Sequence, residues 1–181
     1  MVHFLKTTKY PVKSPVADYR DNAYNAGIDG FMPSNTKEFR EALSEKNKTL
    51  AFGEGNTSWF DVEKGVLHIA PQEDVLIPSG LYTKLDPMTM LYDANKSGVA
   101  TKKKLAVGAC VIDVSYQGIV HYHVYNFGKE WTSLLCDEKV CQMIQIPVLT
   151  GMTVEENIEP ENWFEVKTDR GAGGFGSTGS V

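Results

Sequence analysis

The stretch LAVGACVIDVSYQGIVHYHVY, residues 105–125, decides the class of fold that this sequence predicts. Two apolar runs rich in β-branched and aromatic residues, Leu105–Val114 and Ile119–Tyr125, flank the turn-forming sequence SYQG at 115–118. Such runs, bounded by Gly, Pro, Ser and Asn, are typical of strands joined by turns. Further runs of this kind occupy Val66–Ile69, Val75–Ile77 and Val140–Leu149. Many short strands at close spacing predict an all-β barrel or sandwich.

The composition fits one globular domain. The chain has 181 residues, of which 42% are hydrophobic and 23% charged, and these are ordinary values for such a domain. The formal net charge of −5 at pH 7 argues against a nucleic-acid partner, because the overall field repels phosphate backbones. No apolar run approaches a membrane span of about 18 residues, and the polar start resembles no signal peptide. We therefore expect a soluble, intracellular protein without a membrane partner.

One segment departs from the strand pattern. Between Ser34 and Lys48, Asn35 and Glu38 fit a capping box, and Phe39, Ala42 and Leu43 follow a helical spacing. The segment predicts a short amphipathic helix, followed by a Gly-rich loop. The helix has two interpretations: it covers one end of the barrel, or it has a function as a surface for a protein partner or as a lid.

The C-terminal stretch RGAGGFGSTG, residues 170–179, has five glycines in ten residues. Backbone entropy keeps such a segment mobile when nothing is bound. Yet Arg170 supplies a fork for phosphate, Phe175 a stacking plane, and Ser177 and Thr178 two hydroxyl donors. The segment lacks the Gly-Lys-Ser/Thr ending of a P-loop, which disfavours an ordinary ATPase.

Five short motifs in a fixed order give the chain a resemblance from about Ala26 to the C-terminus. They read AGID at 26–29, KSGVA at 96–100, CVIDVSYQG at 110–118, KVCQMI at 139–144 and RGAGGFGSTG at 170–179. In this order they resemble the motifs of the trimeric deoxyuridine triphosphate nucleotidohydrolases, the dUTPases.

The resemblance implies an architecture. It implies a jelly-roll-like β-barrel over residues 1–169, with an insertion at about 35–64 and a mobile segment, 170–181, that closes the active site. It also implies a homotrimer whose active sites form between subunits, with the C-terminal segment lent by a neighbour.

The resemblance also implies the reaction, hydrolysis of dUTP to dUMP and pyrophosphate. Asp113 would orient or deprotonate the attacking water, and Tyr116 would pack against the deoxyribose and exclude a 2′-hydroxyl. Main-chain groups between Ala109 and His121 would read the uracil. The substrate-binding residues so implied are Lys96, Ser97, Gly98, Cys110, Val111, Ile112, Tyr116, Gln142, Arg170, Phe175, Gly176, Ser177 and Thr178. Asp29 would hold Mg²⁺ through a bound water.

Three positions depart from the family pattern. Lys96 and Lys139 stand where the family usually has arginine, so a planar fork is lost while the charge stays. Cys110 replaces a glycine, which adds a side chain where the family's hairpin approaches the uracil. These changes affect affinity and fine geometry rather than the reaction class.

Other interpretations stay open from the residues alone. A related dCTP deaminase would carry a carboxylate three places before Asn126, where this chain has His123. A dUTP-responsive regulatory protein would use the helical insertion on a partner. His121 and His123 share one strand face, but the sequence offers no third metal ligand. Taken singly, each charged residue also fits a solvated surface position.

Overall fold

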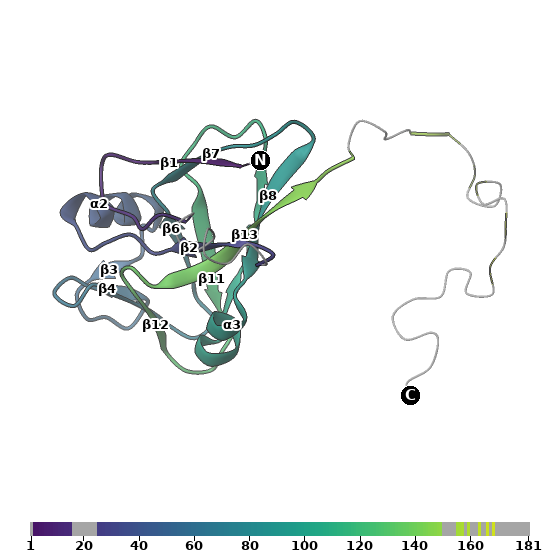
Figure 1. The fold of residues 1–181 in the computed structure, drawn as a ribbon. Helices are drawn as coiled ribbons and strands as arrows, with labels where there is room; N and C mark the ends of the chain where they lie inside the picture. Colours follow the sequence, from purple (N-terminus) through teal and green to yellow (C-terminus); the bar gives the residue numbers. More distant parts are fainter. Residues whose placement is uncertain are drawn as a thin grey trace. The chain divides into compact units, whose positions relative to one another are not determined.

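Four small β-sheets make up most of the fold in the computed structural model (Figure 1), which describes residues 2–15, 25–149 and seven positions between 155 and 168. The described residues up to 148 form one compact unit. The predicted domain boundary at 169 and 170 lies outside the described residues, so it stays a prediction. No helix of the described ranges is long and apolar enough to cross a membrane.

The central sheet has the strand order β10-β8-β13-β2, and every neighbouring pair in it is antiparallel. The other sheets are β6-β11-β9, β12-β5-β4-β3 and β1-β7. The strands are β1 (His3–Lys6), β2 (Ile28–Phe31), β3 (Ala51–Phe52), β4 (Trp59–Asp61), β5 (Val66–Ile69), β6 (Asp74–Pro78), β7 (Leu81–Lys84), β8 (Thr89–Asn95), β9 (Leu105–Val107), β10 (Val111–Asp113), β11 (His121–Asn126), β12 (Thr132–Leu135) and β13 (Lys139–Pro147). The expected all-β class is therefore confirmed.

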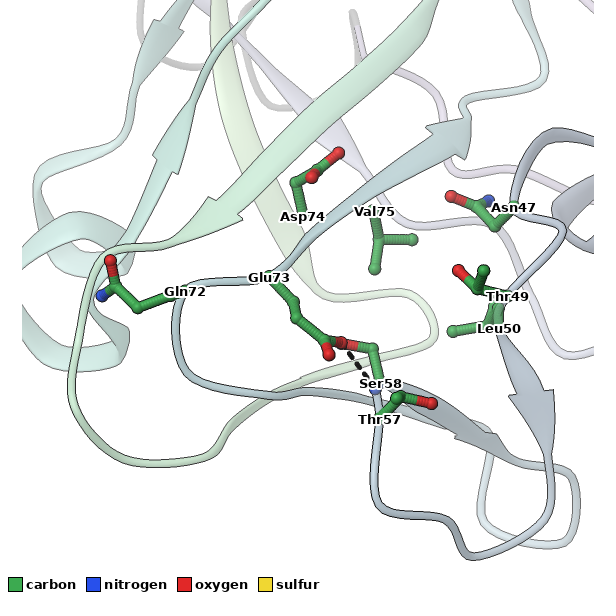
Figure 2. A pocket seen from close by; sticks show the side chains of 9 residues that line it. All are labelled: Asn47, Thr49, Leu50, Thr57, Ser58, Gln72, Glu73, Asp74 and Val75. Carbon is green, nitrogen blue, oxygen red and sulfur yellow. Dashed lines mark hydrogen bonds between the residues drawn. The ribbon is translucent and has the colours of Figure 1, made fainter.

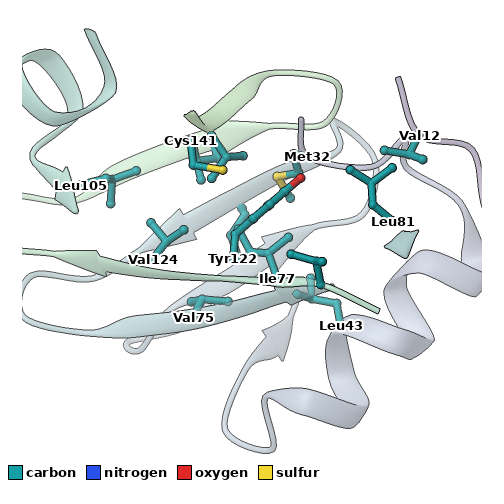
Figure 3. Packing of buried hydrophobic residues seen from close by; sticks show 14 of the residues in the cluster. Val12, Met32, Leu43, Val75, Ile77, Leu81, Leu105, Tyr122, Val124 and Cys141 are labelled. Carbon is teal, nitrogen blue, oxygen red and sulfur yellow. The ribbon is translucent and has the colours of Figure 1, made fainter. Parts of the chain in front are cut away.

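The core lies between these sheets because alternate residues of each strand point inward. Along β11 the buried residues are Tyr122, Val124 and Asn126, whereas His121 and His123 are half-buried on the opposite face. Figure 3 shows Tyr122 and Val124 packed with Val75 and Ile77 of the neighbouring strand β6. The inward face of β11 is thus part of the core, and its outward face is free for function. Strands β10 and β11 lie in different sheets, so the hairpin that the family resemblance implied between Ala109 and His121 is a turn that joins two sheets.

The insertion carries helix α2 (Lys37–Lys46), as predicted, with Phe39 and Leu43 buried against the core. The expected capping residue was wrong. Thr36, not Asn35, is the N-cap, and its hydroxyl accepts a hydrogen bond from the Phe39 N–H at 3.3 Å. Asn35 instead donates to the Val62 carbonyl at 2.8 Å and accepts from Arg40 at 2.7 Å. Its amide therefore ties the start of α2 to the end of the insertion.

A second helix, α3 (Ser97–Lys103), was not predicted. Lys102 and Lys103 form the last turn of α3. Lys104 then adopts a left-handed conformation with φ 56°, which ends the helix before β9. Strand β8 was also not predicted, because its sequence TMLYDAN contains Asp93 and Asn95, and both residue types are disfavoured in strands.

Candidate functional site

A small pocket of about 190 Å³ lies beside strand β10. It brings together the predicted residues Val111, Ile112, Asp113 and Tyr116. Its other lining residues, which the motif did not single out as ligands, are Leu76, Ala109, Val120 and His121. The walls are mostly apolar, while one carboxylate and one phenol stand at the opening. This is the character of a site for a flat, partly polar ring.

The turn between β10 and β11 holds Tyr116 in place. The Tyr116 hydroxyl donates to the Ile119 carbonyl at 2.8 Å, and its backbone N–H donates to the Asp113 carbonyl at 3.1 Å. A side chain at Gly118 would overlap the Tyr116 hydroxyl, which is why this position requires glycine. The ring remains 41% exposed, so one face is available for a ligand.

His121 joins the pocket as a half-buried imidazole. Burial lowers its pKa, and the charge of Lys46 lowers it further, against the opposing effects of the Ile119 backbone and Glu45. The residue therefore favours its neutral form, which can both donate and accept a hydrogen bond. In the sequence it stands out only as an unexplained histidine on the outward strand face.

A second cluster at the central sheet combines two predicted site residues, Asp29 and Lys96, with Lys139, which the sequence marked only as a departure from the family pattern. Asp29 on β2 lies between Lys96 and Lys139, with Nζ of Lys96 2.8 Å from Oδ1 and Nζ of Lys139 2.7 Å from Oδ2. Burial raises the pKa of Asp29, but the hydrogen bonds from Lys139 and Lys96 outweigh it and hold the pKa below its usual value. The side chain is only 14% exposed, so the carboxylate is fixed and ionised.

The remaining predicted phosphate ligands lie next to this cluster. Lys96 is the N-cap of α3, and Ser97 and Gly98, both exposed, form its first residues. Added bulk at Gly98 would meet nothing within 4 Å, so the backbone there is open to a ligand. Gln142 on β13 pairs directly with Asp29 on β2. Together these residues form a positively charged, hydrogen-bonding surface suited to phosphate.

Within one chain, the pocket and the lysine cluster are separate. Asp113 pairs with Met90 of β8, whereas Asp29 lies across β13 from Ala94 of β8, at the opposite edge of the same sheet. Three strand spacings of about 4.8 Å, combined with four residues of about 3.4 Å along β8, place the two carboxylates roughly 20 Å apart. The structure therefore does not bring all predicted site residues together in a single copy.

Several predicted residues lie outside the pocket lining. Cys110 adjoins the pocket, and its carbonyl accepts the Asp93 N–H at 2.8 Å. The predicted ligands Arg170, Phe175, Gly176, Ser177 and Thr178 lie outside the described residues. Across the part of the chain that is described, no three Asp, Glu, His or Cys side chains gather as a metal site.

A larger cavity of about 340 Å³ lies between the insertion and β6 (Figure 2). Several of its polar side chains are already engaged: Glu73 accepts from the Ser58 N–H at 2.7 Å and from the Ser58 hydroxyl at 2.6 Å. The Asn47 side chain binds both backbone groups of Leu76, at 2.8 and 2.9 Å. These contacts attach the insertion to the sheet edge next to the first pocket.

Comparison with known proteins identifies the family. The dUTPase family model matches residues 63–179, more than half of the chain. This chain belongs to the dUTPase family. The predicted resemblance is thereby confirmed, although the AGID sequence at 26–29 precedes the matched residues.

Two curated relatives illustrate the extent of the match. The deoxyuridine 5′-triphosphate nucleotidohydrolase of Clostridium acetobutylicum is 36% identical over 129 residues, which cover 70% of this chain and 83% of that protein. That of Yarrowia lipolytica is 38% identical over 103 residues, covering 57% of this chain and 58% of that protein. The chain thus spans little more than half the length of some relatives.

Solved structures support the fold. The dUTPase of Staphylococcus bacteriophage 80alpha, solved with dUPNHPP, superimposes with a TM-score of 0.67 at 18% identity, covering 99% of both chains. A dUTPase from EIAV superimposes with a TM-score of 0.56 at 18% identity, covering 91% of this chain and 100% of that one. The jelly-roll-like β fold expected from the motifs is confirmed.

Proposed function

We propose that this protein hydrolyses dUTP to dUMP and pyrophosphate. The observation that supports this most directly is the pocket that joins Asp113 and Tyr116 on the turn after β10. The pocket combines the carboxylate of Asp113, the aromatic ring of Tyr116 and an apolar slot, which are the groups that the family motif implies for this site. The family membership and the names of the curated relatives point to the same reaction.

Asp113 is suited to act on water. It is the last residue of β10 and is exposed, while its neighbour Ile112 is buried and anchors the strand. A carboxylate fixed in this way can orient a water molecule and accept its proton during attack at the α-phosphorus. The attack releases pyrophosphate as the leaving group.

Tyr116 is suited to select the sugar. Its ring is anchored by the hydroxyl bond to Ile119 and lies close to Gly118, where a side chain would overlap it. A deoxyribose packed against that ring has no space for a 2′-hydroxyl, so UTP would be rejected. The apolar pocket behind it would accept the base, and pairing with backbone groups would favour uracil over cytosine.

The Asp29 cluster is suited to bind the phosphates and Mg²⁺. Lys96 and Lys139 bring positive charge, and Ser97, Gly98 and Gln142 bring hydrogen-bonding groups. The two lysines use one acceptor position on each oxygen of Asp29, so further positions remain for a magnesium-bound water. Magnesium bound with the triphosphate would neutralise charge on the leaving group.

The separation of the two parts supports a shared active site. The pocket and the Asp29 cluster lie roughly 20 Å apart in one copy, so one nucleotide needs the pocket of one subunit and the phosphate ligands of another. Val111 and Val114 are exposed beside the pocket, at 56% and 47%, as expected for a surface that a second copy covers. We therefore include a homotrimer in the proposal, closed by the segment 170–181 of a neighbour.

The alternatives lack a supporting observation. At the position where a dCTP deaminase would carry its carboxylate, His123 is bound to Asp74 and the Ala109 backbone. The apolar side of α2 is buried through Phe39 and Leu43, so the insertion presents mainly polar groups to a partner.

Pyrophosphate release from dUTP, UTP, dCTP and dTTP tests the proposal. We expect turnover of dUTP in Mg²⁺ and little turnover of the other three. Equal rates on all four nucleotides, or none on dUTP, would contradict it.

A further inference from the structure

His123 contacts Ala109, one of the residues that line the candidate nucleotide pocket, and uses both of its ring nitrogens. Nδ1 lies 3.1 Å from the backbone nitrogen of Ala109, and Nε2 lies 2.9 Å from Oδ2 of Asp74. The Ala109 N–H can only donate, so Nδ1 must accept and the ring proton sits on Nε2, where it donates to Asp74. The two contacts together therefore fix one tautomer.

The same residue also binds the preceding backbone group. The Gly108 N–H donates to the His123 carbonyl at 2.9 Å, so two successive N–H groups of the 108–109 segment end on one residue. A side chain at residue 108 would overlap Nδ1 of His123, which explains why glycine stands there. The segment is therefore held on His123 by backbone and side chain at once.

This contact matters because of where Ala109 lies. Ala109 lines the pocket, and Cys110 and Val111, the first residue of β10, follow it in the segment whose backbone groups would recognise the base under the proposed function. Because its N–H is bound to His123, Ala109 cannot offer that group to a nucleotide. The bond also sets the direction in which the next backbone groups face.

We propose that His123, oriented by Asp74, is a positioning residue for base selection: it holds the 108–111 backbone in the register that distinguishes uracil from cytosine. This inference rests on the proposed function. His123 touches no reacting atom, so its loss acts through Ala109 and changes discrimination between bases more than turnover of bound dUTP.

Two amide substitutions separate the two ends of the ring. In His123→Asn the amide oxygen can occupy the place of Nδ1 and accept the Ala109 N–H. In His123→Gln the amide reaches the place of Nε2, toward Asp74, and leaves Ala109 unbound. We expect the ratio of kcat/KM for dUTP over dCTP to fall about tenfold in His123→Gln and His123→Ala, the scale of one misplaced hydrogen-bonding group. His123→Asn should stay within about threefold of the wild type.

Amide hydrogen exchange of Ala109 gives a readout that does not depend on activity. We expect faster exchange in His123→Gln and slower, wild-type-like exchange in His123→Asn. Asp74 is largely exposed, so Asp74→Asn and Asp74→Ala should fold even where changes at His123 do not. The first keeps an acceptor for Nε2–H and should match the wild type, while the second should speed exchange at Ala109.

A matched control is His68→Ala. His68 is also half-buried on a strand, but it stacks on Trp59 at 4.2 Å in a different sheet. The His68→Ala variant should leave base discrimination unchanged.

Equal discrimination in His123→Gln, His123→Asn and the wild type would overturn the inference, as would unchanged Ala109 exchange in His123→Gln and Asp74→Ala. If wild type and His68→Ala both fail to hydrolyse dUTP, the proposed function fails, and the exchange data still decide whether His123 holds the segment.

Discussion

Carboxylates on the two faces of the central sheet lie in opposite environments, and their pKa values shift in opposite directions. On the outer face, Asp29 is bound by two lysines, which hold its pKa below the usual value despite burial. On the inner face, Asp93 of β8 is 1% exposed, and neither of its oxygens has a hydrogen-bond partner among the described residues. Burial raises the pKa of Asp93 to about 7.

The difference separates function from stability. An ionised group that is paired with two lysines is ready to act on a charged ligand, whereas an isolated buried acid is tolerated mainly in its neutral form. Changes on the outer face should therefore alter catalysis and leave folding unchanged. Changes on the inner face should do the reverse, and each of the following variants tests this separation.

The largest effect is expected at Asp113, on the outer face. Asp113→Asn keeps the shape but removes the base, so kcat for dUTP should fall by about 10²- to 10⁴-fold while the melting temperature stays the same. Steady-state kinetics and calorimetry on the same preparation measure both. Near-wild-type turnover would remove Asp113 from the mechanism.

The next largest effect is expected at Asp93, and it concerns stability. Folded Asp93 keeps its proton up to about pH 7, whereas the unfolded chain loses it at about pH 4. The free energy of unfolding should therefore fall as pH rises between these values, by up to ~4 kcal/mol at about 1.36 kcal/mol per pKa unit. Asp93→Asn should remove this part of the pH dependence, and Asp93→Leu should raise the melting temperature at pH 8.

Thermal unfolding between pH 4 and 8 measures the difference between wild type and variant. Because Asp29 has a lowered pKa, its own contribution runs the other way and is lost as pH falls. Both wild type and Asp93→Asn contain Asp29, so the difference between their unfolding free energies cancels the Asp29 contribution. An identical pH slope in both proteins would mean that Asp93 is ionised and paired, and dUTP turnover should not change in either variant.

How much of this was visible in the sequence depends on the range of the contacts involved. Asp113 and Tyr116 are three residues apart, so the motif alone predicted that they share a site. Asp29 and Lys96 were predicted as separate site residues, and Lys139 was noted only as a departure from the family pattern. Their mutual pairing depends on the register of β2, β13 and α3.

Asp93 and His123 could not be predicted for the same reason. Asp93 lies in β8, a strand that the composition of its sequence did not predict. Only the pairing of β8 with β10 and β13 shows that the Asp93 side chain faces the core. The partners of His123 lie 49 and 14 residues away along the chain. Local patterns predict the strands, whereas tertiary packing decides which polar side chains are buried or joined.

A smaller effect is expected at Lys96, again on the outer face. Lys96→Met should lower kcat/KM for dUTP about tenfold, mainly through KM, because one charged contact to phosphate is lost. Lys96→Arg should restore it, since arginine keeps the charge. Lys103→Met is the matched control: Lys103 pairs with Glu138 at 2.8 Å and is buried to a similar degree. If both methionine variants lower kcat/KM equally, the effect is structural rather than specific to phosphate binding.

The smallest effect is expected outside the central sheet, at the start of α2. The Thr36 hydroxyl caps the helix through the Phe39 N–H, and replacing such a cap by alanine costs about 1 kcal/mol. Thr36→Ala should therefore lower the free energy of unfolding by about 1 kcal/mol at neutral pH, without changing KM. Because its own backbone N–H and the Thr36 hydroxyl hold the pKa of Glu38 below its usual value, the loss should become smaller at low pH, where Glu38 is protonated. Thr36→Ser, which keeps the hydroxyl, should recover most of the loss. Denaturant unfolding at two pH values, with dUTP kinetics alongside, gives all three quantities. The insertion is bound to Leu76 of the pocket through the Asn47 side chain. A change in KM would therefore show that the stability of α2 affects the nucleotide site through this contact. Stability and function would then be coupled at the insertion, whereas they are separate on the two faces of the sheet.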